Sequence, residues 1–182
     1  LHTGQVCGVE VLSRWLHPVR DVLSPAVFLP ILEGQGLMDS LLFTQLDQAL
    51  SLQKEAASRG FCLNMAFNLQ AAQLARSELT TSIRGILARH SAFGSGLTFE
   101  LTESGLLAAP AISMENLVRL RMMGCRLSID DFGAGFSSLQ RLCQLPFSEI
   151  KLDAEFVRTL DLEPRCRAVI SSTLALGETL GM

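Results

Sequence analysis

Short apolar segments and helix-like segments alternate along almost the whole chain, and this order restricts the fold more than any other feature. Apolar runs typical of strands occur at Val6–Leu16, Phe61–Leu69, Gly96–Ser104, Cys125–Asp131 and Ser148–Asp153. Helices are predicted between and after them at Ser24–Gly36, Leu37–Arg59, Leu74–His90, Ile112–Met123, Ser137–Leu145, Ala154–Leu160 and Arg165–Leu180. This alternation is typical of a parallel sheet covered by helices, so we predict an α/β protein with its helices outside the sheet.

Length and composition narrow the class of protein further. The 182 residues are 48% hydrophobic, which suffices for one domain with a substantial core. No apolar run approaches the roughly 18 residues of a membrane span, and the N-terminal residues lack the pattern of a signal peptide. A net charge of −3 without a basic run argues against binding of nucleic-acid polymers. Five scattered cysteines without a CxxC pair indicate reduced thiols and a cytoplasmic location.

Each predicted strand carries an acid, an amide or a lysine near its C-terminal end. These residues are Glu10, Asn68, Glu100, the adjacent Asp130 and Asp131, and Lys151. About 30 residues separate Asn68 from Glu100 and Glu100 from Asp130, the length of one strand–helix unit. Because the C-terminal ends of parallel strands open on one face of a barrel, we expect these side chains to share one site.

The residue types at these strand ends favour a metal-dependent reaction at phosphate. Carboxylate and amide oxygens suit a hard cation such as Mg²⁺ or Mn²⁺. Two cations about 4 Å apart would suit displacement at a phosphodiester, and Lys151 supplies a positive charge that can orient or acidify the attacking water. Asp130 and Asp131 would point in opposite directions on a regular strand, and we expect the glycine turn after them to let both reach metal.

Each position also has an ordinary structural interpretation. An acid at a strand end is commonly an exposed residue at the sheet edge. Asn68 could cap the next helix, Glu10 could pair with Arg14, and Lys151 could be a solvated edge lysine. The coincidence of polar residues at all five strand ends favours a shared site over these separate explanations.

Five sequence blocks resemble the EAL-domain family, the bacterial phosphodiesterases that act on cyclic di-GMP. They are, in chain order, GVEVLSRWLHP, FNLQAAQL, FELTES, IDDFGAGFSSL and LPFSEIKLDAEFV. One block alone would be a weak signal, whereas five in order at this spacing are specific. The resemblance runs from about Gly8 to the C-terminus and implies a TIM-barrel-like (β/α) barrel, mostly parallel, with about five of its eight strands in this chain.

The resemblance also implies a role for each matching residue at the metal site. One metal would be held by Glu10, Asn68, Glu100 and Asp130. A second metal would be bridged by Asp130 and bound by Asp131 as well. Glu10, Asp130, Asp131 and Lys151 are the implied catalytic residues, with Lys151 assisting the nucleophilic water.

Three further residues receive implied roles outside the metal site. The backbone at Leu12 and the side chain of Arg14 would contact the substrate. Glu103 would anchor the loop Phe132–Ser138, which in this family couples metal binding to dimerisation. The resemblance therefore implies a homodimer.

The function implied is Mg²⁺- or Mn²⁺-dependent hydrolysis of cyclic di-GMP to linear pGpG in bacterial second-messenger signalling. The alternative is a receptor module that binds the dinucleotide without cleaving it. Residues 1–182 are expected to form a single EAL domain that lacks the first strand and the last two strand–helix units, so the chain alone could be inactive. Any association with a membrane would come through a separate domain of the parent protein.

Overall fold

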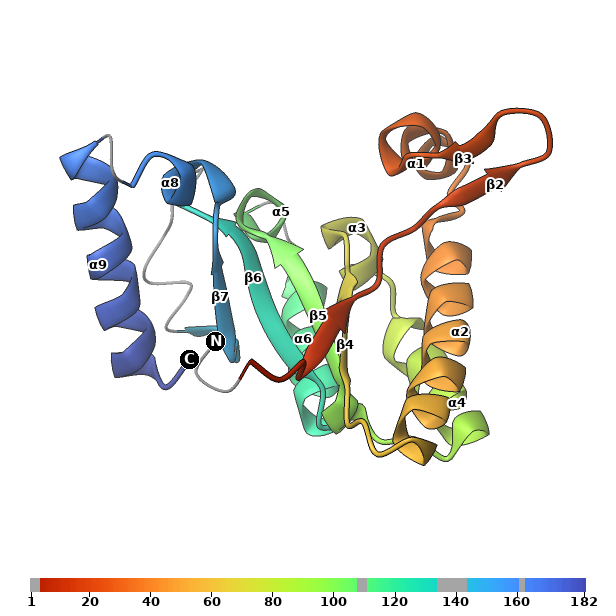
Figure 1. The fold of residues 1–182 in the computed structure, drawn as a ribbon. Helices are drawn as coiled ribbons and strands as arrows, with labels where there is room; N and C mark the ends of the chain where they lie inside the picture. Colours follow the sequence, from red (N-terminus) through yellow and green to blue (C-terminus); the bar gives the residue numbers. More distant parts are fainter. Residues whose placement is uncertain (1–3, 108–110, 134–143, 161–162) are drawn as a thin grey trace.

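The computed structural model describes residues 4–107, 111–133, 144–160 and 163–182. Five parallel strands form a half-barrel with helices around it, as predicted (Figure 1). In spatial order the strands are β1 (Gly8–Glu10), β4 (Asn64–Asn68), β5 (Leu97–Thr102), β6 (Arg126–Phe132) and β7 (Glu149–Leu152). All five were expected from the sequence, although the structure makes each of them shorter than or slightly displaced from the predicted run.

The helices connect the strands and follow the last one. They are α1 (Pro25–Gly34), α2 (Met38–Ser58), α3 (Ala71–Leu74), α4 (Leu79–His90), α5 (Glu103–Leu107), α6 (Ala111–Met122), α8 (Ala154–Arg158) and α9 (Pro164–Leu180), with a 3₁₀ turn at Gly94–Gly96. Pro25 starts α1 at a position where its missing N–H costs nothing, and Gly60 follows the end of α2 with a φ of +87°. Across the described ranges, no helix combines the length and the apolar character that crossing a membrane requires.

Two predicted elements have different bounds in the structure. The single strand expected at Val6–Leu16 is two strands: β1, and β2 (Trp15–His17), which pairs antiparallel with β3 (Asp21–Leu23). The helix expected at Leu74–His90 begins only at Leu79, as α4, and Leu74 is the last residue of the separate short helix α3. Asn116 of α6 binds the segment between the two helices, since its Nδ2 donates to the carbonyls of Leu74 and Arg76 at 2.7 and 2.8 Å. The helix predicted for 137–145 lies almost entirely outside the described residues.

The core lies between the outer face of the sheet and the helices that cover it. Phe67, Phe99 and Leu127 point to this side and are at most 1% exposed. They pack in one cluster with apolar residues of α2, α4 and α6, among them Leu46, Leu50, Ile83, Leu117 and Leu120. The alternate residues of the same strands point to the inner face, where the polar side chains are found.

Candidate active site

The strand register places the predicted site residues in one row on the inner face. Glu10 lies beside Ala66, Asn68 beside Glu100, and Asp130 beside Thr102. Paired residues of parallel strands share a face, as do residues two apart on one strand. It follows that Glu10, Asn68, Glu100 and Asp130 all point to the inner side, toward the C-terminal end of the sheet.

A bulge in β6 brings the second aspartate to the same place. Ile129 pairs with Ile150 and Phe132 pairs with Leu152, so two residues of β6, Asp130 and Asp131, lie opposite Lys151 alone. Asp131 has a φ of +54°, a left-handed conformation that few non-glycine residues adopt. The irregularity in β6 therefore occurs at Asp131 itself, within the strand, and not at the glycine turn, where the sequence predicted it.

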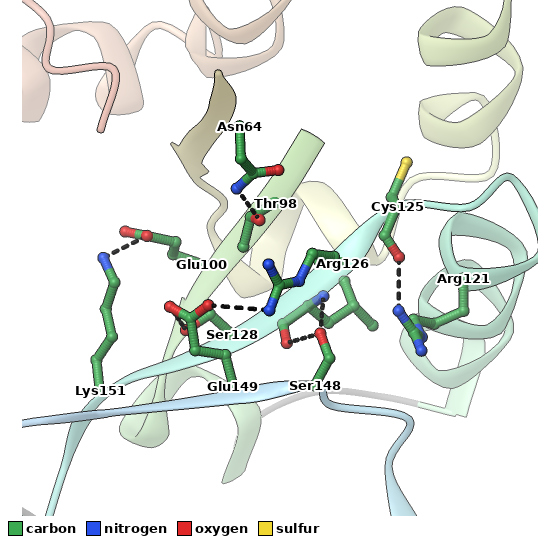
Figure 2. Close-up of polar contacts among 11 residues, drawn as sticks. Asn64, Thr98, Glu100, Arg121, Cys125, Arg126, Ser128, Ser148, Glu149 and Lys151 are labelled. Atoms are coloured by element: carbon green, nitrogen blue, oxygen red, sulfur yellow. Dashed lines mark hydrogen bonds and ion pairs between the residues drawn. The ribbon is translucent and has the colours of Figure 1, made fainter. Parts of the chain in front are cut away.

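The polar side chains of the row meet in pairs. Asn68 Nδ2 donates to Glu10 Oε1 at 2.8 Å, and both side chains are exposed. Lys151 Nζ contacts Glu100 Oε1, as Figure 2 shows. The Glu100 side chain is fully buried, whereas that of Lys151 is 31% exposed. The alternative pairing of Glu10 with Arg14 is not formed, because Glu10 accepts from Asn68 and Arg14 donates to its neighbouring Ser13 carbonyl.

The pair formed by Glu100 and Lys151 has pKa values set by burial and by the surrounding acids. Burial raises the pKa of Glu100 against the opposing hydrogen bond and charge of Lys151, and the charges of Glu10 and Asp130 raise it further. Burial lowers the pKa of Lys151, but the hydrogen bond and charge of Glu100, with Asp130 and Glu10, outweigh it and raise the pKa. Lys151 is therefore a cation at neutral pH and cannot serve as a base there.

The pKa of Asp131 is also influenced by burial and by neighbouring acids. Burial raises the pKa of its carboxyl group, the charges of Asp130 and Asp153 raise it further, and Lys151 acts in the opposite direction. The positive charge of Lys151 thus compensates only part of the negative charge of Asp130, Asp131 and Asp153.

The residues present fit a divalent cation in donor chemistry. All the candidate ligands offer carboxylate or amide oxygens, the donors that Mg²⁺ and Mn²⁺ prefer. Glu100 Oε2 is buried and has no hydrogen-bond partner among the described residues, a position that a cation would satisfy. Within those residues, no three His, Cys, Asp or Glu side chains are gathered closely enough to hold an ion. In this row the side chains lie in two pairs, Glu10 with Asn68 and Glu100 with Lys151.

The remaining predicted residues lie around this row. Asn68 does not cap the next helix, because Gln70 takes that position and forms a reciprocal capping arrangement with Gln73. Leu12 and Arg14 lie between β1 and β2 and line a cavity of about 590 Å³ together with residues of α1 and α2. Both side chains are exposed.

Glu103 lies at the start of α5 and reaches the neighbouring strand. It is 7% exposed, and its Oε2 accepts a hydrogen bond from the Gly133 N–H at 3.1 Å. Gly133 belongs to the loop Phe132–Ser138 that Glu103 was expected to anchor. Residues 134–138 of that loop lie outside the described residues.

The structure shows further inner-face residues that the sequence analysis did not select, among them Ser128, Arg126 and Glu149. Ser128 Oγ donates to Glu149 Oε1 at 3.4 Å, and Arg126 lies 3.7 Å from Glu149 Oε2 (Figure 2). These residues precede Asp130 and Lys151 by two or four positions. A period of two counted back from the predicted site residues would have identified them.

The chain is similar in sequence to known proteins over its whole length. A family model described as "EAL domain" matches residues 1–182. The chain is 47% identical over 182 residues to the cyclic di-GMP phosphodiesterase RocR of Pseudomonas aeruginosa, covering 100% of this chain and 46% of that protein. It is 39% identical over 180 residues to the bifunctional diguanylate cyclase/cyclic di-GMP phosphodiesterase MucR of the same organism, covering 98% and 26%. The chain thus spans less than half the length of these curated relatives.

Solved structures show the same likeness in three dimensions. The PaMucR phosphodiesterase in complex with c-di-GMP superposes with a TM-score of 0.90 at 39% identity, covering 98% of this chain and 73% of that one. The EAL enzyme Bd1971, in its form bound to cAMP and cyclic di-GMP, has a TM-score of 0.86 at 29% identity, covering 96% and 49%. The half-barrel is therefore similar to a large part of a TIM-barrel-like EAL fold.

Proposed function

Since the chain belongs to the EAL domain family, we propose that it hydrolyses cyclic di-GMP to linear pGpG with divalent metal ions. Relatives named as cyclic di-GMP phosphodiesterases support this substrate and reaction. The observation that carries the proposal is Glu100. Its carboxylate is fully buried and has one oxygen without a hydrogen-bond partner in the part of the chain that the structure describes. It lies in the row of oxygen donors and contacts the lysine opposite the two aspartates.

The proposed metal site uses the inner-face row. Glu10, Asn68, Glu100 and Asp130 would hold one Mg²⁺ or Mn²⁺, and Asp130 with Asp131 would hold a second. Bound there, the cations would polarise the phosphodiester and lower the pKa of a bound water. Glu10 and Asp130 lie close enough to Glu100, and Asp130 close enough to Asp131, for their charges to raise the pKa values of Glu100 and Asp131 beside the effect of burial. This concentration of acids supports the attraction of a divalent cation.

Lys151 would act as a hydrogen-bond donor during the reaction. Its raised pKa keeps the ammonium group protonated at neutral pH. The group has three N–H donors, and its contact with Glu100 uses one side of it, so others remain to orient the attacking water. Because Lys151 lies opposite both aspartates, this water would be held beside the proposed metal site.

Substrate recognition would involve the segment between β1 and β2. Arg14 is exposed and its guanidinium donates to the adjacent Ser13 carbonyl, a local contact that leaves it able to turn to a phosphate of the dinucleotide. The backbone at Leu12 would contact the substrate beside it. We further propose that residues 1–182 belong to one EAL domain that acts as a homodimer in the cytoplasm.

The test is a direct measurement of turnover and binding on one protein sample. The purified parent protein that contains this chain is incubated with cyclic di-GMP and Mn²⁺, with EDTA in place of metal as the control, and pGpG is quantified by chromatography. We expect pGpG only with metal. Dinucleotide binding by calorimetry without any metal-dependent turnover would contradict hydrolysis and identify a receptor module.

A further inference from the structure

Gly133, directly after β6, is enclosed between a carboxylate and an aromatic ring. Its N–H donates to Glu103 Oε2 on one side. On the other side, a β carbon at Gly133 would lie only 2.9 Å from Phe156 Cε2 and 3.4 Å from Cζ. The φ of Gly133 is +100°, so this position excludes side chains by backbone conformation as well as by space.

Phe156 is itself fixed to the strand that carries Lys151. It lies on α8, which follows β7, and the Asp153 N–H between them donates to the Phe132 carbonyl at 3.3 Å. The Asp153 carboxylate then caps α8 by accepting from the Glu155 N–H at 2.6 Å. The ring of Phe156 therefore has a defined place relative to both β6 and β7.

These contacts enclose the part of β6 that is least regular. Asp131, in its left-handed conformation, is two residues from Gly133, and the bulge there places both aspartates opposite Lys151. A left-handed aspartate persists only where its surroundings hold it. The chain immediately beyond it is held by the ring of Phe156, by the carboxylate of Glu103, and by the Asp153 N–H on the Phe132 carbonyl.

We propose that Phe156 is a positioning residue that holds Gly133, and through it the bulge carrying Asp130 and Asp131, opposite Lys151. The inference rests on the proposed metal site, because the geometry that it preserves is that of the metal-binding aspartates. Phe156 would touch neither metal nor substrate and would act only through Gly133.

The first measurement does not depend on metal or on activity. Amide hydrogen exchange at Gly133 is followed by NMR in the wild-type protein and in Phe156→Ala, with the amides of β5 as an internal reference. We expect exchange at Gly133 to accelerate at least tenfold while β5 is unchanged, because the ring covers this glycine. The matched control is Val157→Ala on the same helix, where the side chain is 54% exposed and exchange at Gly133 should stay within twofold.

The second measurement is the Mn²⁺ dissociation constant, obtained by EPR titration of the same variants. We expect about tenfold weaker binding in Phe156→Ala, an intermediate value in Phe156→Leu, and no change in Val157→Ala. Gly133→Ala should weaken binding too, and its combination with Phe156→Ala should be less than multiplicative, since both changes disturb one contact. A cooperative thermal transition identifies the variants that fold, and Phe156→Leu gives the answer if Phe156→Ala does not.

Two results would overturn the inference: Gly133 exchange within twofold of wild type in a folded Phe156 variant, or faster exchange with unchanged Mn²⁺ affinity. The second result would make Phe156 a packing residue only. A wild-type protein that binds Mn²⁺ without hydrolysing cyclic di-GMP would overturn the proposed function, and the exchange and affinity measurements would still support the role of Phe156.

Discussion

The two faces of the half-barrel differ although the same strands form them. Phe99 and Glu100 are neighbours in the sequence, yet Phe99 points outward into the apolar core and Glu100 points inward to Lys151. Ile129 and Asp130 show the same division on β6. Because strand residues alternate between faces, adjacent positions can encode stability and chemistry separately. The comparison predicts that changes on the outer face alter unfolding and changes on the inner face alter metal binding and turnover.

The largest effect is expected on the outer face, for Phe99→Ala. Phe99 is fully buried and its ring centroid lies 6.0 Å from that of Phe67. Removing a buried ring leaves a cavity, and such changes cost about 3–5 kcal/mol. Urea unfolding measures the loss. Phe93→Ala is the control, because Phe93 is 81% exposed and its truncation should cost less than about 0.5 kcal/mol.

The next effect belongs to the inner face and concerns Asp130→Asn. Asp130 is the residue proposed to contact both metals, and the change keeps its shape while removing a charge that offsets the repulsion between two cations. We expect hydrolysis to fall about a hundredfold or more, equivalent to about 2.7 kcal/mol or more, with a much smaller change in dinucleotide affinity and in unfolding. Retention of more than about a tenth of the wild-type rate would contradict the two-metal proposal.

Two companion variants sharpen the result for Asp130. Asp131→Asn should be similar but milder, because Asp131 would serve one metal only. Glu103→Ala should weaken Mn²⁺ binding indirectly, since it removes the acceptor of the Gly133 N–H. A larger loss of Mn²⁺-dependent hydrolysis in Asp130→Asn than in Asp131→Asn would identify Asp130 as a bridging ligand. Equal losses would indicate that the two aspartates contribute only negative charge.

The strands and the inner-face row could be predicted because their signals are local. A short apolar run that ends on Asn68 or Asp130 indicates a strand and its C-terminal end without reference to any other part of the chain. The spacing of about 30 residues then orders the strands in parallel, and the shared edge brings their polar ends together. The family follows from the same residues, since they lie in its sequence blocks.

The features that could not be predicted depend on contacts between distant residues. The segment between α3 and α4 is bound by Asn116 of α6, which no local pattern near Leu74 reveals. The bulge at Asp131 exists only relative to β7, so the sequence placed the irregularity at the glycine turn instead. The preference of Lys151 for Glu100 likewise depends on the burial of Glu100, which becomes apparent only once the sheet is folded.

Thiol reactivity provides a probe of burial on the outer side of β6. Burial raises the pKa of the Cys125 thiol to about 11, from 9.0. At pH 8 its thiolate fraction should be about a hundredfold below that of an unperturbed thiol, and alkylation slower by at least that factor. Cys7 and Cys62 are exposed and should react readily. Peptide mapping after iodoacetamide treatment reads each cysteine separately, and rapid labelling of Cys125 in folded protein would contradict its burial.

The smallest effect concerns the ion pair between Lys151 and Glu100 on the inner face. The pKa of Lys151 is raised above 10.5, with burial opposing and Glu100 promoting the charged form. The charge of Lys151 therefore contributes its full stability from neutral pH up to pH 10.5, and this contribution is lost as the pH rises through the raised pKa of the folded state. With the lysine 31% exposed, we expect a contribution of about 1 kcal/mol or less.

Lys151→Met isolates this contribution. The wild-type protein should lose stability relative to the variant above pH 10.5, and the difference between their urea midpoints should be constant between pH 8 and pH 10. The alkaline range is favourable because the chain has no tyrosine, and Lys54, the other lysine, is present in both proteins. If the difference between the two urea midpoints stayed constant through pH 12, the pKa of Lys151 would not be raised by Glu100. The charge of this inner-face residue would then contribute nothing to stability, and stability would depend on the outer face alone at this position.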